Sequence, residues 1–190
     1  MRQRTLDELE AGLPWIQQVP ADEGTLRMIV IRPSRDARRV LEEIEISVSG
    51  GVHGDRWESD CSKRLPNGQS HPDMQISIMN VRAIELIAGE TDRWQLAGDN
   101  LYLDLDLSHD NLLPGQQLAI GSAVIEVTAI PHNGCRKFGE RYGSDALQFV
   151  NSEIGRELHL RGIYAKVVVD GVVSVGDVVR KVSSTEGTER

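Results

Sequence analysis

The chain has 190 residues, and its 21 Lys and Arg against 29 Asp and Glu give a formal net charge of −8. Domains that bind nucleic acid are usually basic, so this charge argues against a nucleic-acid partner. The length fits one domain, or one domain with an appendage, and it is sufficient to bury a core without disulfides or metals.

The cysteine spacing and the lack of membrane and signal-peptide patterns predict the compartment of the protein. No run reaches the roughly 18 apolar residues of a membrane helix, and the first residues lack the apolar core of a signal peptide. The two cysteines, Cys61 and Cys135, are far apart and lack the paired spacing of a structural zinc site. We therefore expect a cytoplasmic protein with reduced thiols and no membrane partner.

The N-terminal segment predicts a short helix. Residues Thr5 to Glu8 have the spacing of a capping box, and Gly12 and Pro14 are stop signals. Residues 1–24 are therefore assigned to an N-terminal helical appendage. The β-rich run 26–32 predicts a strand, and residues 40–46 suggest another, although their Glu-rich composition is also compatible with a helix.

Residues 50–73 show no periodicity. Loops longer than about 15 residues are uncommon in compact domains and are usually functional or disordered. We therefore expect this segment to border a ligand pocket and to become ordered when ligand binds.

The middle of the chain predicts strands and one helix. Residues 75–79 predict a strand, and Asn80 caps a helix that ends at Gly89. Residues 101–107 alternate strictly, which predicts a strand with its leucines in a core and with Asp104 and Asp106 facing water. A solvated strand face explains these two carboxylates better than an acid–base pair does.

The C-terminal third predicts a β meander with helices. Residues 117–130 read as a hairpin around Gly121-Ser122; helices over 144–151 and 152–158 and strands over 163–169, 172–175 and 178–182 follow. The whole pattern predicts a mainly β fold with a few short helices, a closed or partly closed β-barrel over residues 25–182. The polar residues 183–190 predict a disordered tail.

Cys135 lies just past this hairpin, where a stiff strand would hold it while leaving it open to ligands. Its neighbours Arg136 and Lys137 are cationic, and nearby positive charge favours the reactive thiolate. The alternative is a small buried hydrophobe, which is the more common state of a free cysteine. Cys61 lies in the aperiodic segment 50–73 and is interpreted as incidental, with Lys63 and Arg64 as solvated loop charges.

Four groups of motifs occur in a recognisable order. Around Cys135 they are Leu-Pro-Gly at 113–115, Ile-Glu-Val-Thr at 125–128 and Gly-Cys-Arg-Lys-Phe at 134–138. The other groups are Gly-Val-His-Gly-Asp-Arg-Trp at 51–57, Ala-Gly-Asp-Asn-Leu at 97–101, and the strand-like segments 161–167 and 175–179. Together they resemble the MOSC domain family, named for the C-terminal domain of molybdenum cofactor sulfurases.

The resemblance implies a MOSC-type β-barrel that binds the molybdenum cofactor, which is a pterin with a dithiolene, a terminal phosphate and a metal centre. It implies that Cys135 is catalytic, either as a molybdenum ligand or as the carrier of persulfide sulfur. Arg56 offers a planar fork suited to phosphate or pterin oxygens. The further candidates for cofactor binding are Asp55, His53, Asn100, Asp99, His132, Lys137 and Arg161.

Each candidate also has a structural alternative. Asp55 and Arg56 would pair with the scaffold, and Asp99 and Asn100 would cap the strand that follows them. The two histidines and Arg161 would be solvated or structural. These alternatives stay open at the level of sequence.

Three activities fit the resemblance. The leading one is cofactor binding with Cys135 as metal ligand or sulfur carrier; the others are a molybdenum-dependent reductase of N-hydroxylated compounds and a non-catalytic cofactor carrier. The chain has no room for the pyridoxal-phosphate desulfurase of full sulfurases, so no pyridoxal phosphate is expected. The expected partners are a small-molecule ligand and either a desulfurase-type sulfur donor or an electron-transfer protein, and the oligomeric state stays open. Gly134 stands where many family members have Pro, which predicts a less rigid loop.

Overall fold

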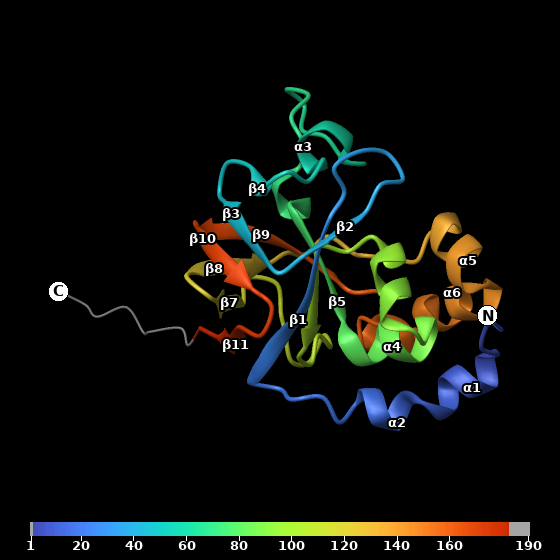
Figure 1. Cartoon of the computed structure of the whole chain (residues 1–190). Coiled ribbons are helices and arrows are strands. Elements are labelled where there is room, and N and C mark those ends of the chain that lie inside the picture. The colour runs from blue at the N-terminus through green and yellow to red at the C-terminus, as the bar shows by residue number, and fades with distance from the viewer. Residues whose placement is uncertain (1, 183–190) are drawn as a thin grey trace.

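A computed structural model describes residues 2–182, so the tail predicted at 183–190 lies outside the described residues. Its centre is a closed β-barrel (Figure 1). Strand β1 pairs with both β6 and β11, which closes the ring β1–β11–β7–β8–β9–β5–β6, and β2 pairs with β1 outside that ring. The structure therefore confirms the predicted fold class, a mainly β barrel with a few short helices.

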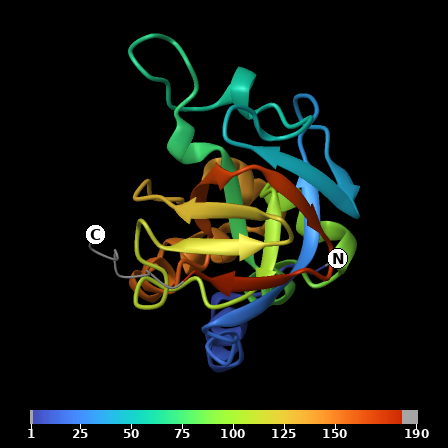
Figure 2. The same ribbon diagram turned by 90° about the vertical axis from the view of Figure 1, so that its left-hand side faces the viewer.

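The strands of this sheet are β1 (Glu23–Ile31), β2 (Arg39–Leu41), β5 (Ile76–Asn80), β6 (Leu101–Asp104), β7 (Gln117–Ile120), β8 (Ala123–Val127), β9 (Ile163–Val169) and β11 (Val178–Lys181). The pair β5–β6 is parallel, and the other pairs are antiparallel. A parallel pair needs a crossover connection, and here α4 (Val81–Ala88) and the 3₁₀ helix η2 (Thr91–Ala97) provide it. Figure 2 shows the yellow hairpin β7–β8 beside the dark red β11, on the side of the barrel away from the helices.

A second, smaller sheet contributes apolar side chains to the barrel core. It consists of β3 (Glu43–Ser47), β4 (Gly51–Val52) and β10 (Gly171–Ser174) in the order β10–β3–β4. Ile46, Val52 and Val173 from this sheet are buried in the same apolar cluster as the inward-facing leucines and isoleucines of the barrel. The two sheets therefore share one core.

A second apolar cluster joins the helices to the outer face of the barrel. Figure 1 shows these helices gathered on one side of the strands. Met28, Met79 and Tyr102 point outward from their strands and are buried under Phe138 and Phe149. The helices of this layer and the N-terminal helices are α1 (Leu6–Ala11), α2 (Leu13–Ile16), α4, α5 (Arg136–Tyr142), α6 (Ser144–Asn151) and α7 (Glu153–Glu157). Both faces of β5 and β6 are therefore covered except at Asp104, which was predicted to face water and is instead half-buried and paired with Arg82.

The capping residues explain where the N-terminal helices begin and end. These helices pack against the same helical layer. Thr5 and Glu8 form the predicted capping box of α1, and Gly12 ends that helix. Pro14 opens α2 instead of ending α1, since proline is tolerated in the first turn of a helix. Leu9 and Ile16 are buried in the second cluster, so these residues are part of the folded body.

Several predicted boundaries were wrong. Residues 40–46 form two strands, β2 and β3, and the strand predicted over 101–107 ends at Asp104, although Leu105 and Leu107 are still buried in the barrel core. The hairpin strand predicted to reach residue 130 ends at Val127. The sequence analysis also missed η2 and α5, whose short apolar patterns have no strong caps.

Residues 50–73 contain short regular elements that their aperiodic sequence did not predict. They contain β4, the short helix α3 (Trp57–Asp60), a bridge between Arg64 and Ser70 and the start of η1 (Pro72–Met74). Trp57 is buried, and its indole Nε1 donates a hydrogen bond to the His71 carbonyl at 3.2 Å. The segment projects from one end of the barrel in both views (Figures 1 and 2).

Candidate functional site

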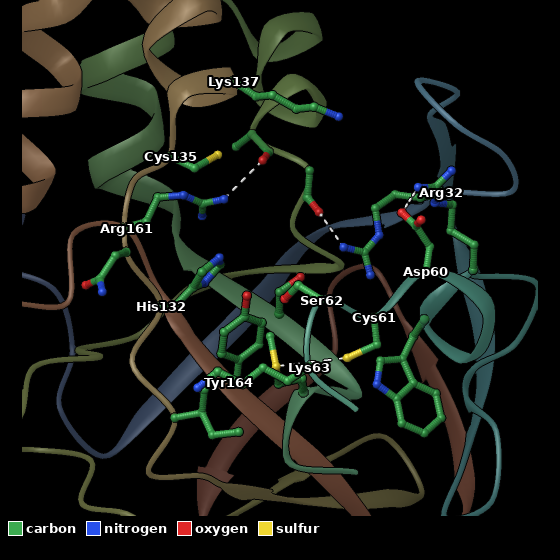
Figure 3. Close-up of a pocket in the computed structure, with 18 of the residues that line it drawn as sticks. Arg32, Asp60, Cys61, Ser62, Lys63, His132, Cys135, Lys137, Arg161 and Tyr164 are labelled. Atoms are coloured by element: carbon green, nitrogen blue, oxygen red, sulfur yellow. Dashed lines mark hydrogen bonds and ion pairs between the residues drawn. The ribbon is translucent and has the colours of Figure 1, made fainter. Parts of the chain in front are cut away.

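A cavity of about 460 Å³ lies between the segment that contains α3, the loop before α5 and the adjoining end of the barrel (Figure 3). Its lining contains more cationic than anionic side chains and includes both cysteines. The charged, sulfur-containing and aromatic polar residues are Arg32, Arg38, Arg56, Arg161, Lys63, Lys137, Asp36, Asp60, Cys61, Cys135, His132 and Tyr164. Pockets of 300–1,000 Å³ are typical of sites for small molecules and cofactors.

The structure brings five of the predicted site residues together in this lining. These are Cys135, Arg56, His132, Lys137 and Arg161. Asp55, Asp99 and Asn100 lie behind the lining, where the side chains of the two aspartates are fully buried. His53 is exposed and lies outside the cavity.

Asp55 is a structural hub beneath the cavity. Its Oδ1 accepts hydrogen bonds from Arg32 Nη2 at 2.7 Å and from the Trp57 backbone N–H at 3.0 Å. Its Oδ2 accepts from Arg32 Nε at 2.9 Å and from the Arg32 backbone N–H at 2.8 Å. Asp55 therefore fixes both the start of α3 and the guanidinium group of Arg32, which does reach the cavity.

Asn100 connects two of the sequence motifs through this hub. Its Nδ2 donates to Asp55 Oδ2 at 3.1 Å and to the Val30 carbonyl at 3.2 Å. Its Oδ1 accepts from both the backbone N–H and the hydroxyl of Ser77, each at 3.1 Å. With every polar atom of its amide engaged inside the fold, Asn100 holds the scaffold together.

Asp99 fixes the guanidinium group of Arg161, as Asp55 fixes that of Arg32. Arg161 Nη1 donates to Asp99 Oδ2 at 2.7 Å, and Nη2 donates to the Ala97 carbonyl at 3.1 Å. The guanidinium also lies 5.0 Å from the centre of the Phe138 ring. Burial opposes the charge of Arg161, but the Asp99 carboxylate outweighs burial and raises the pKa of Arg161, so this cation is fixed in place.

His132 and Tyr164 form an aromatic wall beside Arg161 (Figure 3). Their ring centres are 4.3 Å apart at an interplanar angle of 30°. Burial, together with the charges of Arg161 and Arg32, holds the pKa of His132 well below its ordinary value, so the imidazole is neutral at pH 7. Burial raises the pKa of Tyr164 to about 12, so its phenol keeps its proton.

Cys135 is exposed and is the N-cap residue of α5. It does not directly follow the hairpin strand as expected, because residues 128–134 separate β8 from α5. Gly134 anchors it instead: the Asn151 side chain accepts the Gly134 N–H at 2.9 Å and donates to the Gly134 carbonyl at 3.1 Å. A Cβ atom on Gly134 would lie 2.8 Å from Val150 and 2.9 Å from Leu147, so this glycine allows close packing instead of loosening the loop.

Cys61 shares the cavity with Cys135 but lies on another part of its wall (Figure 3). Its Sγ is 4.0 Å from the Met74 Sδ atom. No local spacing marks Cys61 in the sequence, and its position follows only from the folding of residues 50–73 over the barrel end.

The cations of the lining differ in how they are neutralised. Arg32 pairs with Asp55, Arg161 with Asp99, and Arg56 with Asp60. Lys137 lies 3.9 Å from an Asp36 oxygen.

In the described part of the chain, Arg38 is the lining guanidinium without an ion pair. Its Nη1 donates to the Ala37 carbonyl, and its Nε is buried with no hydrogen-bond partner. Burial and the charges of Arg141 and Arg32 lower the pKa of Arg38. A cation in such surroundings favours binding of an anion.

Arg32, Arg38 and Tyr164 are among the lining residues that sequence reasoning missed, and two others, Cys61 and Lys63, were interpreted as incidental and as a solvated loop charge. Arg32 and Arg38 flank the turn after β1, and a basic residue at the end of a core strand was the one available signal. Lys63 and Cys61 belong to the aperiodic segment, where no pattern predicts the direction of a side chain.

The donor set is suited to an anion and a soft metal. Four guanidinium groups provide planar forks for phosphate oxygens, and an exposed cysteine sulfur is a ligand for soft metals. Among residues 2–182, no cluster of three or more His, Cys, Asp or Glu has the arrangement needed to hold a metal ion.

None of the described helices is long and apolar enough to span a membrane.

Comparisons with known proteins agree with this architecture. The solved structure of the YUAD protein from Bacillus subtilis is 18% identical, with a TM-score of 0.62, and the match covers 83% of this chain and 94% of that one. YiiM from Escherichia coli is 19% identical, with a TM-score of 0.55, and the match covers 85% of this chain and 71% of that one. YiiM from Geobacillus stearothermophilus is 15% identical, with a TM-score of 0.52, and the match covers 88% of this chain and 76% of that one. No curated protein matches the chain significantly. A family model of the MOSC domain matches residues 46–180, well over half of the chain, and the protein therefore belongs to the MOSC domain family.

Proposed function

We propose that the cavity binds the molybdenum cofactor and that Cys135 is its point of contact with the metal or with transferable sulfur. The observation that carries the proposal is the combination, in one cavity of about 460 Å³, of an exposed cysteine, Cys135, and the half-buried guanidinium group of Arg38, which has no ion pair among the described residues. Membership of the MOSC family supports a role related to this cofactor.

The residues present fit the chemical parts of the cofactor. The guanidinium group of Arg38, which lies near the charge of Arg32 and has no ion pair among the described residues, suits the terminal phosphate, because guanidinium groups bind phosphate through parallel hydrogen bonds. The exposed sulfur of Cys135 suits molybdenum, since thiolates are preferred ligands of soft metals. When bound, the cofactor supplies a redox-active metal held by its dithiolene.

The protein residues around it have distinct tasks in this proposal. Arg161, fixed by Asp99 and Ala97, adds a permanent positive charge to the lining. The rings of His132 and Tyr164, which stack against each other at an interplanar angle of 30°, add polar edge atoms to the lining for contact with the pterin. Asp55 and Asn100 act indirectly, because they fix the Arg32 side chain that lines the cavity.

Sulfur transfer through Cys135 is chemically balanced if a partner provides a persulfide. The Cys135 thiolate attacks the outer sulfur of the partner's persulfide, the partner's S–S bond breaks, and the partner leaves as a thiolate. Cys135 then carries the sulfur as a persulfide. The exposure of Cys135 supports this step, because a donor's persulfide has to reach the sulfur directly.

The test is metal, pterin and sulfur analysis of protein purified from a host that makes the cofactor and from one that cannot. We expect molybdenum and pterin only from the first host. Sulfur released by cyanide would assign Cys135 to sulfur transfer, whereas bound molybdenum without such sulfur would assign it to metal ligation.

Turnover of an N-hydroxylated compound with an artificial electron donor would identify a reductase, and stoichiometric release of cofactor without turnover would identify a carrier. Protein free of molybdenum, pterin and labile sulfur from both hosts would contradict the proposal.

A further inference from the structure

Two buried polar atoms beside the cavity face each other without any other partner. Nδ1 of His132 lies 3.6 Å from Oδ1 of Asp99, and the two side chains are 8% and 0% exposed. Both atoms are buried, and neither has a hydrogen-bond partner in the described structure. Since an unpaired buried polar group is costly, these two atoms are expected to satisfy each other after a small closing movement.

The charges around Asp99 decide which of the two carries the proton. Its other oxygen, Oδ2, accepts a hydrogen bond from Arg161 at 2.7 Å. Burial raises the pKa of Asp99, but the charges of Arg161, Arg32 and Arg38 all oppose that effect. A neutral Asp99 would leave the buried Arg161 without its counter-charge, which is the more costly arrangement. The Asp99 carboxylate is thus an acceptor only, and the proton between the two groups belongs to the imidazole.

We propose that Asp99 holds His132 in the tautomer with its proton on Nδ1, so that Nε2 presents an unprotonated acceptor to ligands that carry an N–H or O–H group. The His132 ring lines the cavity (Figure 3). Among the described residues, its Nδ1 is buried without a hydrogen-bond partner. In metal and catalytic sites, a carboxylate behind a histidine fixes the tautomer and orientation of the ring in the same way. Asp99 is then a positioning residue, and His132 is the residue that contacts ligand.

The choice of ligand rests on the proposed function. The edges of a pterin ring carry N–H groups, which an acceptor at His132 would recognise. The tautomer itself does not depend on any ligand, so the two parts of the inference can fail separately.

The tautomer is measured on wild-type protein without ligand. Protein labelled with ¹⁵N-histidine is examined at pH 7 by long-range ¹H–¹⁵N correlation, and the His132 signals are assigned by their loss in His132→Gln. We expect Nδ1 to show the shift of a protonated nitrogen and Nε2 that of an unprotonated one. A proton on Nε2, or on both nitrogens, would overturn the inference.

Asp99→Asn gives a second measurement on the same signal. The Asn side chain can rotate to donate its own N–H to Nδ1, which would move the imidazole proton to Nε2. The matched control is Asp104→Asn, because Asp104 pairs with Arg82 outside the cavity lining, and its spectrum should keep the wild-type tautomer. If Asp99→Asn does not fold, the wild-type spectrum alone decides the question.

The ligand is tested by titrating a free pterin into wild type and folded Asp99→Asn. A donor placed where an acceptor is needed should weaken binding roughly tenfold, the equivalent of one lost hydrogen bond. Equal affinities despite a changed tautomer would overturn the claim about the ligand. Wild type that binds no pterin would overturn that claim and count against the proposed function, while the tautomer measurement would stand.

Discussion

Asn151 of α6 holds the backbone of Gly134 with two hydrogen bonds, one to its N–H and one to its carbonyl. This pairing fixes the residue that immediately precedes Cys135. We predict that Asn151→Ala lowers the free energy of unfolding by about 1–3 kcal/mol, because both backbone groups lose their partner. Urea denaturation measures the change, with the exposed Asn67→Ala as control. A loss no larger than that of the control would show that the pairing does not stabilise the loop.

Asp55 is predicted to stabilise the fold without contacting ligand. Asp55→Asn should lower the free energy of unfolding by about 3–5 kcal/mol, because it removes the buried counter-charge of Arg32. The exposed Asp92→Asn is the control for loss of a charge. Equal stability of the two variants, measured by urea denaturation, would mean that the Arg32–Asp55 pair is dispensable.

Arg38 is predicted to be the stronger anion contact, ahead of Arg56. Arg38→Ala should weaken the binding of inorganic phosphate by about 1.5–3 kcal/mol, the value of a charged hydrogen bond. Arg56→Ala should have a smaller effect, because Arg56 already pairs with Asp60. Affinities from NMR titration, with Arg136→Ala outside the lining as control, decide the order. A larger loss for Arg56→Ala would restore the sequence-based expectation that Arg56 is the main anion contact.

His132 is predicted to make stability depend on pH. Its pKa is depressed in the folded protein by burial and by Arg161 and Arg32, so below about pH 6.5 the unfolded chain binds a proton that the folded protein does not. The free energy of unfolding should therefore fall by about 1.4 kcal/mol from pH 7.5 to pH 5.5 on account of this residue. Asp99 and Tyr164 also face the ring, but the direction follows from the folded His132 staying neutral.

The measurement for His132 is urea denaturation at the two pH values. His132→Gln should flatten the dependence by that amount. His53→Gln, a substitution at an exposed histidine outside the cavity, is the control for removal of an imidazole. An identical slope in His132→Gln and wild type would refute the assignment.

Local patterns predicted those parts of the fold that local chemistry determines. Asn80 and Gly89 bound α4 as expected, since cap residues act within one turn. The alternating leucines of residues 101–107 are all buried in the barrel core. The alternation did not predict that Tyr102 on the other face is also buried, because the covering helices come from distant parts of the chain.

The site could be predicted only in part, for the same reason. Cys135 and Arg161 lie in motifs that resemble the family, and both line the cavity. Asp55 and Asn100 lie in similar motifs but form a buried network, which a sequence shows as two unrelated polar residues. Arg38 has no motif, and its predicted role follows from the lack of an ion-pair partner among residues 2–182, which only the folded arrangement reveals.

The most direct test of the account compares wild type, Cys135→Ser and Cys61→Ser, all purified from one host that makes the cofactor. Molybdenum, pterin and cyanide-releasable sulfur are measured per protein chain. We predict that Cys135→Ser folds normally but loses the bound molybdenum or the labile sulfur, whereas Cys61→Ser, whose sulfur lies beside Met74, keeps them. Wild-type levels of all three in Cys135→Ser would contradict the central claim that Cys135 is the functional sulfur of this cavity.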